Sequence, residues 1–305
     1  MTPPASSCSI NESYKYIFLP ICYSFTFIFS ITLNSIILYR SFRQAKRWNA
    51  SLIYMVNLAS TDFMYGLSLP FLVASYIMRD CWVFGDFMCR LVRFLFYFNL
   101  YCSIFFLTCI SVHRYLGICH PIKVITLETK KAVKNTCVLV WIVVFALTCP
   151  IFRFAQTGYV TRMNCWDDAI DKEFLDYIPY GIILHLIGFF LPFSIIAWCY
   201  SRVVLTIFKT LHSQPSSRTR SPYASRRRKS IRTIITITLL FALCFFPFHV
   251  TRTIFLLLKV TGKVPCETMT TVSMCYKVTR PLASFNAWLN ALLYFLTKDK
   301  VGAHC

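Results

Sequence analysis

One group of cationic side chains lies inside stretches of this sequence that are otherwise apolar. The group consists of Arg93, His249, Arg252, Lys277 and Arg280, with Tyr97, Tyr101 and Tyr276 among them. His249 with Arg252, and Lys277 with Arg280, are spaced three residues apart, so each pair shares one face of a helix. If these faces converge, guanidinium groups would bind phosphate in bidentate fashion and the rings could stack on a base. We therefore predict a site for a polyanion.

A plainer interpretation applies to each of these cations taken singly. Long basic side chains near the end of a membrane helix extend toward lipid headgroups, or pair with acids such as Asp167 and Asp168. Spacing alone does not decide between a shared cavity and separate interfacial positions.

A carboxylate, Asp62, also stands within an apolar stretch. Ionisable groups inside spanning helices are costly and usually face the interior of the bundle. The polar residues expected at a similar depth are Asn34, Asn99, Ser103, Asn286 and Asn290. We predict a polar network that holds a cation or a proton, with sodium as the candidate metal ion on Asp62. The alternative is a purely structural carboxylate held by hydrogen bonds.

The composition requires a membrane around these groups. Of 305 residues, 57% are hydrophobic, 17% aromatic and only 14% charged, whereas a soluble domain carries about 25% charged residues. This excludes soluble, disordered, collagen-like and coiled-coil classes. Most of the 15 cysteines lie in apolar runs and are expected to act as small hydrophobic residues rather than as a disulfide scaffold.

Seven segments are long and apolar enough to span a bilayer. They are 16–39, 52–77, 87–119, 132–154, 177–208, 231–258 and 269–296. We predict an all-α membrane protein, a seven-transmembrane helix bundle over residues 16–297. An extracellular segment, 1–15, precedes it, and a short cytoplasmic tail, 298–305, follows.

The orientation follows from the distribution of charge. Lys and Arg gather in the first and second loops of one side, in the run from Arg202 to Arg232 and in the tail, whereas most acids lie on the other side. The basic side is therefore cytoplasmic and the amino terminus is outside. The net charge of +20 is explained by this asymmetry and by contact with anionic lipid, so no nucleic-acid partner is expected.

The predicted outer face carries sites for modification. Asn11 begins a glycosylation sequon. Four cysteines, Cys8, Cys89, Cys165 and Cys266, lie on this oxidising side, with Cys81 as a fifth candidate. An even set predicts disulfides whose pairing the spacing does not fix.

Motifs of other functional classes are missing from the sequence. It has no glycine-rich phosphate loop, no metalloprotease or hydrolase motif and no cysteine pairs at zinc spacing on the inner side. A transporter predicts internal repeats, and the seven spans are dissimilar. We expect a protein that recognises a ligand and is not an enzyme.

The whole set of motifs resembles the rhodopsin-like (class A) G-protein-coupled receptors. The resemblance rests on Asn34, the run from Leu58 to Asp62, Trp82, Cys89, His113-Arg114-Tyr115, Trp141, Pro192, Tyr200 and the run from Phe241 to Phe248. It implies a Cys89–Cys165 disulfide and a plasma-membrane, multi-pass receptor that signals through heterotrimeric G proteins. The residues that it implies for coupling are His113, Arg114, Tyr115, Tyr200 and Tyr294.

Within that family the chain is similar to the metabotropic nucleotide (purinergic) receptors. The stretches 89–97, 107–121, 246–252 and 276–284 carry this resemblance. It implies an extracellular nucleotide as agonist, signalling to phospholipase C and calcium, and a Cys8–Cys266 disulfide. The implied agonist contacts are Arg93, Tyr97, Asp167, His249, Arg252, Tyr276, Lys277 and Arg280. Membrane lipids and a second receptor copy are further candidate partners.

Two departures from the family pattern affect the expected signalling. Ala291 stands where the seventh helix of the family has a proline, which removes a kink expected to help Tyr294 rearrange. The chain also stops at Cys305, too soon for a further amphipathic helix or a phosphorylated tail. Two alternatives therefore stay open: a receptor of this fold for a dicarboxylate or acidic lipid, and a truncated, weakly signalling receptor.

Overall fold

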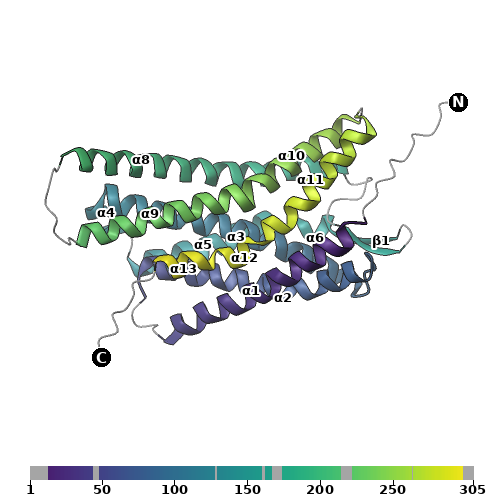
Figure 1. Ribbon diagram of the computed structural model, residues 1–305, viewed down its shortest axis with the longest axis horizontal. Helices are drawn as coiled ribbons and strands as arrows, with labels where there is room; N and C mark the ends of the chain where they lie inside the picture. Colours follow the sequence, from purple (N-terminus) through teal and green to yellow (C-terminus); the bar gives the residue numbers. More distant parts are fainter. Residues whose placement is uncertain are drawn as a thin grey trace.

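The computed structural model describes residues 13–43, 48–127, 129–159, 162–166, 174–213, 222–262 and 264–297. Within these ranges, seven helical segments run side by side as a bundle (Figure 1). They are α1 (Lys15–Arg43), α2 (Ala50–Ile77), α3 (Gly85–Cys119), α5 (Lys130–Thr148) with α6 (Ile151–Phe154), α7 (Phe174–His185) with α8 (Leu191–Ser213), α9 (Pro222–Leu240) with α10 (Phe246–Thr261), and α11 (Cys266–Ser284) with α12 (Asn286–Leu289) and α13 (Ala291–Thr297). The predicted seven-helix fold is confirmed.

The spanning segments differ in how apolar they are. Five of them are apolar and long enough to cross a membrane by those criteria alone: 15–43, 85–119, 130–154, 174–210 and 227–261. The other two, α2 and the α11–α13 segment, carry Asp62, Lys277 and Arg280 together with several asparagines and hydroxyls. The polar residues of the two predicted networks therefore lower the hydropathy of the helices that hold them.

The third helix forms the centre of the bundle. In the most apolar window of α3, 72% of the residues are buried, compared with 28% in α1. Tyr97, Tyr101 and Ser103 of α3 are all completely buried. Side chains along most of the length of α3 therefore lie in the interior of the bundle.

Two π-helical turns interrupt the long helices, and each is followed by a proline. The turn Leu186–Phe190 (η2) precedes Pro192, and the turn Phe241–Phe245 (η3) precedes Pro247. Proline lacks an N–H and its ring crowds the carbonyl four residues earlier, and one extra residue in the turn relieves this crowding. His185 lies directly before the first of these turns, and His249 lies in the first turn of the helix that follows the second.

The chain between the spans contains two elements that sequence patterning did not predict. Strands β1 (Gln156–Tyr159) and β2 (Met163–Trp166) form an antiparallel hairpin, with Thr157 opposite Cys165. A short helix, α4 (Pro121–Leu127), follows α3. Neither segment has a long apolar repeat, and hydrophobic periodicity is the main signal from which helices and strands are predicted.

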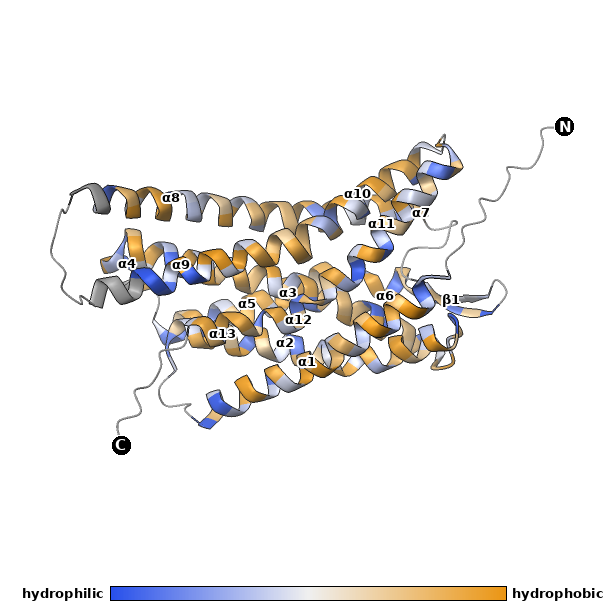
Figure 2. Cartoon of the chain, viewed as in Figure 1, coloured by the Kyte–Doolittle hydropathy of each residue, from blue (hydrophilic) through white to orange (hydrophobic). Residues whose placement is uncertain are grey.

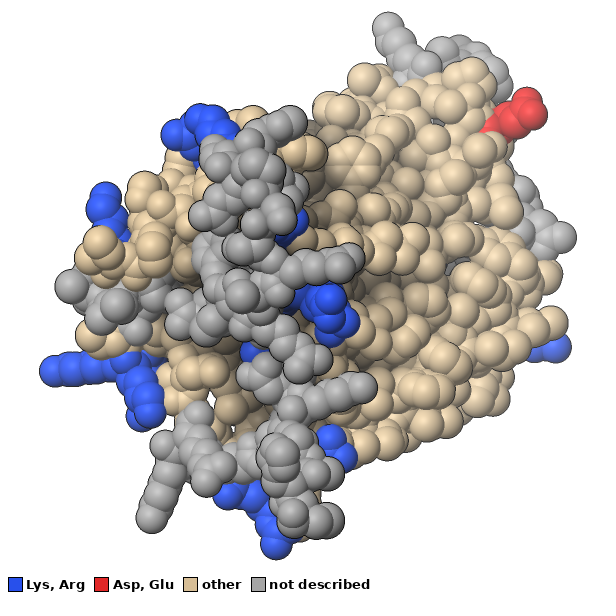
Figure 3. All heavy atoms as spheres, turned by 60° about the vertical axis from the view of Figure 1, so that its left-hand side comes forward, with Lys and Arg blue, Asp and Glu red and all other residues tan. Residues whose placement is uncertain are grey.

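The two ends of the bundle differ in charge. Apolar residues cover the middle of the helices, and hydrophilic residues are concentrated toward the ends (Figure 2). Lys and Arg gather over the end of the bundle where α4 lies (Figure 3). This is the end that the distribution of charge assigned to the cytoplasm.

The last segment of the bundle is interrupted even though it lacks the family's proline. Its helical pattern breaks at Phe285 and again at Asn290, directly before Ala291. Pro281 lies four residues before the first break, and the Asn290 side chain is engaged in hydrogen bonds with α2 and α3. The expected effect of Ala291 on the rearrangement of Tyr294 stays a prediction, because both Phe285 and Asn290 keep right-handed helical backbone angles.

A prediction concerns Gly188, where η2 approaches α3. A Cβ at this position would lie 2.6 Å from Cε1 of Tyr101, whose ring is fully buried. We expect Gly188→Ala to destabilise the protein by about 1–3 kcal/mol, because the ring or the turn must move. Thermal unfolding of the purified protein measures this. Gly117→Ala is the matched control, because its Cβ would meet no atom within 4 Å; equal unfolding temperatures for the two variants would contradict the prediction.

Candidate functional site

Arg252 of α10 lies at the centre of a cluster of tyrosines. Its side chain is fully buried. The guanidinium carbon lies 5.1 Å from the ring centroid of Tyr97, 5.5 Å from that of Tyr177 and 5.6 Å from that of Tyr276. The guanidinium also donates hydrogen bonds to the hydroxyls of Tyr177 and Tyr276. Four segments, α3, α7, α10 and α11, therefore contribute to the surroundings of one buried cation.

Arg280 brings a second guanidinium to this cluster. Its carbon lies 5.5 Å from the Tyr276 ring centroid, so Arg252 and Arg280 contact the same ring. Lys277 lies three residues earlier on α11, and both side chains are half-buried. The predicted convergence of the basic faces of the sixth and seventh spans is therefore present.

Arg93 of α3 connects the cluster to the outer hairpin. Its Nη2 donates to the backbone oxygen of Cys165 over 3.0 Å, and the residue is only 8% exposed. Cys165 is bonded to Cys89, one helical turn before Arg93, with 5.6 Å between the two Cα atoms. The expected Cys89–Cys165 disulfide is thus present and fixes the hairpin above the cations.

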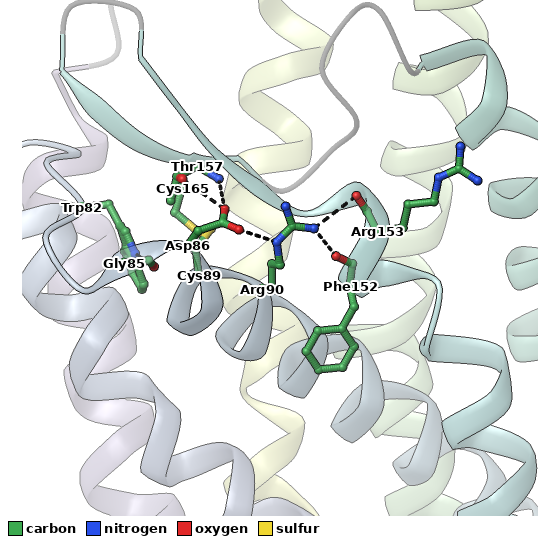
Figure 4. Close-up of polar contacts among 9 residues, drawn as sticks. All are labelled: Trp82, Gly85, Asp86, Cys89, Arg90, Phe152, Arg153, Thr157 and Cys165. Atoms are coloured by element: carbon green, nitrogen blue, oxygen red, sulfur yellow. Dashed lines mark hydrogen bonds and ion pairs between the residues drawn. A yellow bond between two sulfur atoms is a disulfide. The ribbon is translucent and has the colours of Figure 1, made fainter.

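A polar clasp reinforces this attachment (Figure 4). Oδ1 of Asp86 accepts from the amide and the hydroxyl of Thr157 at 2.9 and 3.0 Å, and Oδ2 accepts from Nε of Arg90 at 2.6 Å. Arg90 then donates through Nη1 to the backbone oxygens of Phe152 and Arg153. The first turns of α3 are therefore bound to β1 on one side and to α6 on the other.

His249 lies deeper than Arg252 on the same face of α10. Its Nδ1 is 2.7 Å from the carbonyl oxygen of Phe245, and its Nε2 is 3.3 Å from the hydroxyl of Tyr101. The ring stacks on Phe189 at a centroid distance of 4.1 Å. With 1% exposure, His249 is part of the interior and does not extend toward headgroups.

Two residues of the site were not predicted from the sequence. Tyr177 binds Arg252, and His185 meets His249 edge to face at a centroid distance of 5.4 Å. Both lie on α7, where Tyr177, Gly181 and His185 follow one another at intervals of four residues and so share a face. Polar side chains at that interval inside an apolar span were the available signal.

Several predicted residues lie outside the described part of the chain. These are Asp167, the glycosylation candidate Asn11 and Cys8. Cys266 is disulfide-bonded. The free cysteines among the described residues include Cys81, the fifth candidate on the outer face.

The five predicted members of the Asp62 network meet in the middle of the bundle. The carboxylate accepts from Nδ2 of Asn99 at 2.7 Å and from Nδ2 of Asn290 at 3.1 Å. Ser103 donates to Asn286 at 2.9 Å and lies 3.5 Å from Asp62. Asn34 joins through the carbonyl of Ala287, at 2.7 Å. The network connects α1, α2, α3 and the α12–α13 segment.

The donors around Asp62 suit a small hard cation. Asp62 supplies a carboxylate, Ser103 a hydroxyl, and Oδ1 of Asn290 is a buried oxygen with no hydrogen-bond partner among the described residues. Hard cations prefer such oxygen ligands. Asp62 is the one carboxylate of this set, and the described ranges contain no group of three or more His, Cys, Asp or Glu residues that could hold a metal ion.

The residues predicted for coupling lie at the other end of α3. Nη2 of Arg114 donates to the Ser51 hydroxyl over 3.3 Å, and Arg114 takes part in none of the ion pairs between described residues. The Tyr200 hydroxyl is 2.8 Å from that of Ser111.

The remaining three predicted coupling residues, His113, Tyr115 and Tyr294, occupy the same end. The hydroxyl of Tyr115 is 3.1 Å from Nε2 of His120, His113 is half-buried, and Tyr294 is 5% exposed. All five predicted coupling residues thus lie at one end of the bundle. Among the described residues, the side chain of Arg114 there makes one hydrogen bond, to the Ser51 hydroxyl.

Comparison with known proteins agrees with this architecture. A family model described as 7 transmembrane receptor (rhodopsin family) matches residues 33–294. Purinoceptor 3 of Gallus gallus is 39% identical over 299 residues, which cover 97% of this chain and 89% of that protein. Purinoceptor 2 of Mus musculus is 39% identical over 295 residues, 96% of this chain and 78% of the other. Purinoceptor 4 of Rattus norvegicus is 40% identical over 294 residues, 96% and 79% respectively.

The chain belongs to the rhodopsin family of seven-transmembrane receptors and, within it, to the family of these purinoceptors. It is accordingly a multi-pass membrane receptor and not an enzyme, as the sequence predicted.

The clasp on the hairpin yields a prediction. Asp86→Ala removes the acceptor for the Thr157 amide, so we expect amide hydrogen exchange in residues 156–159 to be roughly 5- to 10-fold faster, the effect of losing about one hydrogen bond. Hydrogen–deuterium exchange with mass spectrometry measures it. The matched control is Asp176→Ala, because its carboxylate makes an exposed ion pair with Arg153 at 3.7 Å. Unchanged exchange in Asp86→Ala would show that the clasp does not hold the hairpin.

Proposed function

We propose that this protein is a plasma-membrane receptor for extracellular nucleotides that signals through heterotrimeric G proteins to phospholipase C and calcium. The phosphate chain of the agonist would contact Arg93, Arg252, Lys277 and Arg280, with His249 and the rings of Tyr97 and Tyr276 beside it and Asp167 nearby. The residues thus come from three helices, α3, α10 and α11.

The main support is that two buried or half-buried guanidinium groups contact one tyrosine ring. Arg252 and Arg280 both lie within 5.6 Å of the Tyr276 centroid. The hydroxyls of Tyr177 and Tyr276 accept hydrogen bonds from Arg252, and such hydrogen bonds reduce the cost of burying a cation. A phosphate would replace them with charge-assisted, bidentate hydrogen bonds. The names of the relatives, purinoceptors, support the same ligand class.

A ligand in this position would act by bridging helices. Phosphate contacts to α3, α10 and α11 would draw their outer ends together, and η3, directly below α10, is a point at which the direction of that long helix can change. The ligand must bind the signalling state better than the resting state, and each tenfold shift in population requires about 1.4 kcal/mol of preference.

The cytoplasmic end would receive the G protein. In this proposal Arg114 leaves Ser51, while His113, Tyr115, Tyr200 and Tyr294 rearrange around it. The single described hydrogen bond of Arg114 supports such a release, because little has to be broken.

The first prediction here tests the cationic site. Arg280→Ala removes a guanidinium that faces Tyr276, so we expect agonist potency to fall at least tenfold, the order expected for a charge-assisted hydrogen bond, with normal surface expression. Calcium release evoked by uridine and adenine nucleotides measures the response. Arg153→Ala is the control, because that arginine lies at the outer end but its side chain is 67% exposed. An unchanged nucleotide response in Arg280→Ala, or a wild type that responds to dicarboxylates and not to nucleotides, would refute the proposal.

The second prediction concerns sodium, which Asp62, Ser103 and Asn290 would hold. Replacing the potassium in the buffer with sodium, at constant ionic strength, should raise the unfolding temperature of the wild type, because a ligand that binds the folded state stabilises it. In Asp62→Asn the effect should disappear, because the amide no longer balances the charge of the ion. Differential scanning fluorimetry measures both. A sodium effect that persists in the variant, or is absent from the wild type, would exclude this site.

A further inference from the structure

His185, the last residue of α7, has a buried nitrogen that has no hydrogen-bond partner among the described residues. The side chain is 5% exposed. Its Nδ1 lies 2.7 Å from the carbonyl oxygen of Gly181. A carbonyl only accepts hydrogen bonds, so Nδ1 carries the proton and Nε2 of the neutral ring is left as an acceptor. That Nε2 is buried, and no group in the described part of the chain bonds to it.

Neighbouring groups do not supply the missing donor. His249 has the same arrangement, because its Nδ1 is bonded to the carbonyl of Phe245 and its Nε2 faces the hydroxyl of Tyr101 at 3.3 Å. The Tyr101 proton is thus directed at His249. The two imidazole rings meet at 5.4 Å, inclined by 81°, and each contributes an acceptor and no donor to the space between their helices.

The position of His185 relates this acceptor to the cationic cluster. Tyr177, two turns earlier on the same face of α7, binds Arg252, and His249 lies one turn below Arg252 on α10. Arg252 is near enough to interact electrostatically with His185. The acceptor therefore lies at the inner side of the site, beneath the guanidinium groups, with the stacked rings of Phe189 and His249 beside it.

A buried acceptor without a donor is destabilising, and native structures rarely leave one unfilled. We propose that His185 is a specificity-determining residue whose Nε2 accepts a hydrogen bond from the nucleoside part of the ligand, either a ribose hydroxyl or a nucleobase N–H. This inference rests on the proposed function. It assigns α7 to the nucleoside and leaves the phosphates to α3, α10 and α11.

The test is a set of matched ligands against matched variants. Membranes carrying the wild type, His185→Leu or His185→Gln are used for competition binding against a labelled uridine or adenine nucleotide. The competitors are the parent nucleotide and its 2′-deoxy, 3′-deoxy and base N-methyl analogues, each of which lacks one donor. Leucine removes the acceptor, whereas the side-chain oxygen of glutamine restores one at a similar distance from the backbone. Binding is used because it does not depend on coupling to a G protein.

We expect one analogue to bind the wild type roughly 10-fold more weakly than its parent, as for one lost hydrogen bond. In His185→Leu the affinities for the parent and this analogue should differ by less than about twofold, because the variant has no acceptor for the missing donor. In His185→Gln the roughly 10-fold difference should return. The same difference in His185→Leu as in the wild type, for every analogue, would overturn the inference and assign the acceptor to a buried water. A wild type that binds no nucleotide would instead overturn the proposed function, and this inference with it.

Discussion

The buried charge of Arg252 is the constraint on which the outer half of this receptor depends. A guanidinium that is fully removed from water must be surrounded by groups that stabilise it. The bundle provides three tyrosine rings, from α3, α7 and α11, and two of their hydroxyls. These helices therefore converge on one side chain, which an anionic ligand would reach in the proposed function.

The cluster is bounded on its outer side by a hairpin fixed to α3 and on its inner side by two interrupted helices. The Cys89–Cys165 disulfide and the Asp86–Arg90 clasp attach the hairpin to α3, and the carbonyl of Cys165 orients Arg93. Beneath the cluster, η2 and η3 interrupt the long helices directly before prolines. The asparagines around Asp62 then connect the inner parts of four segments. A rigid outer rim with interrupted helices below it is an arrangement in which ligand contacts can bias helix positions.

Much of this arrangement could be predicted from the sequence, because the signals are local. Runs of apolar residues gave the spans, and intervals of three residues placed His249 with Arg252 and Lys277 with Arg280. Buried polar residues in apolar surroundings identified the Asp62 network. The hairpin could not be predicted, since its strands have only four residues each. Tyr177 and His185 were missed because their roles depend on partners in other helices.

A structure of the receptor bound to its nucleotide would show whether cations from three helices form one anion-binding cavity. We expect phosphate oxygens within hydrogen-bonding distance of the guanidinium groups of both Arg252 and Arg280, with Tyr177 and Tyr276 displaced from Arg252. Phosphates bound elsewhere, with Arg252 still donating to both tyrosine hydroxyls, would contradict it.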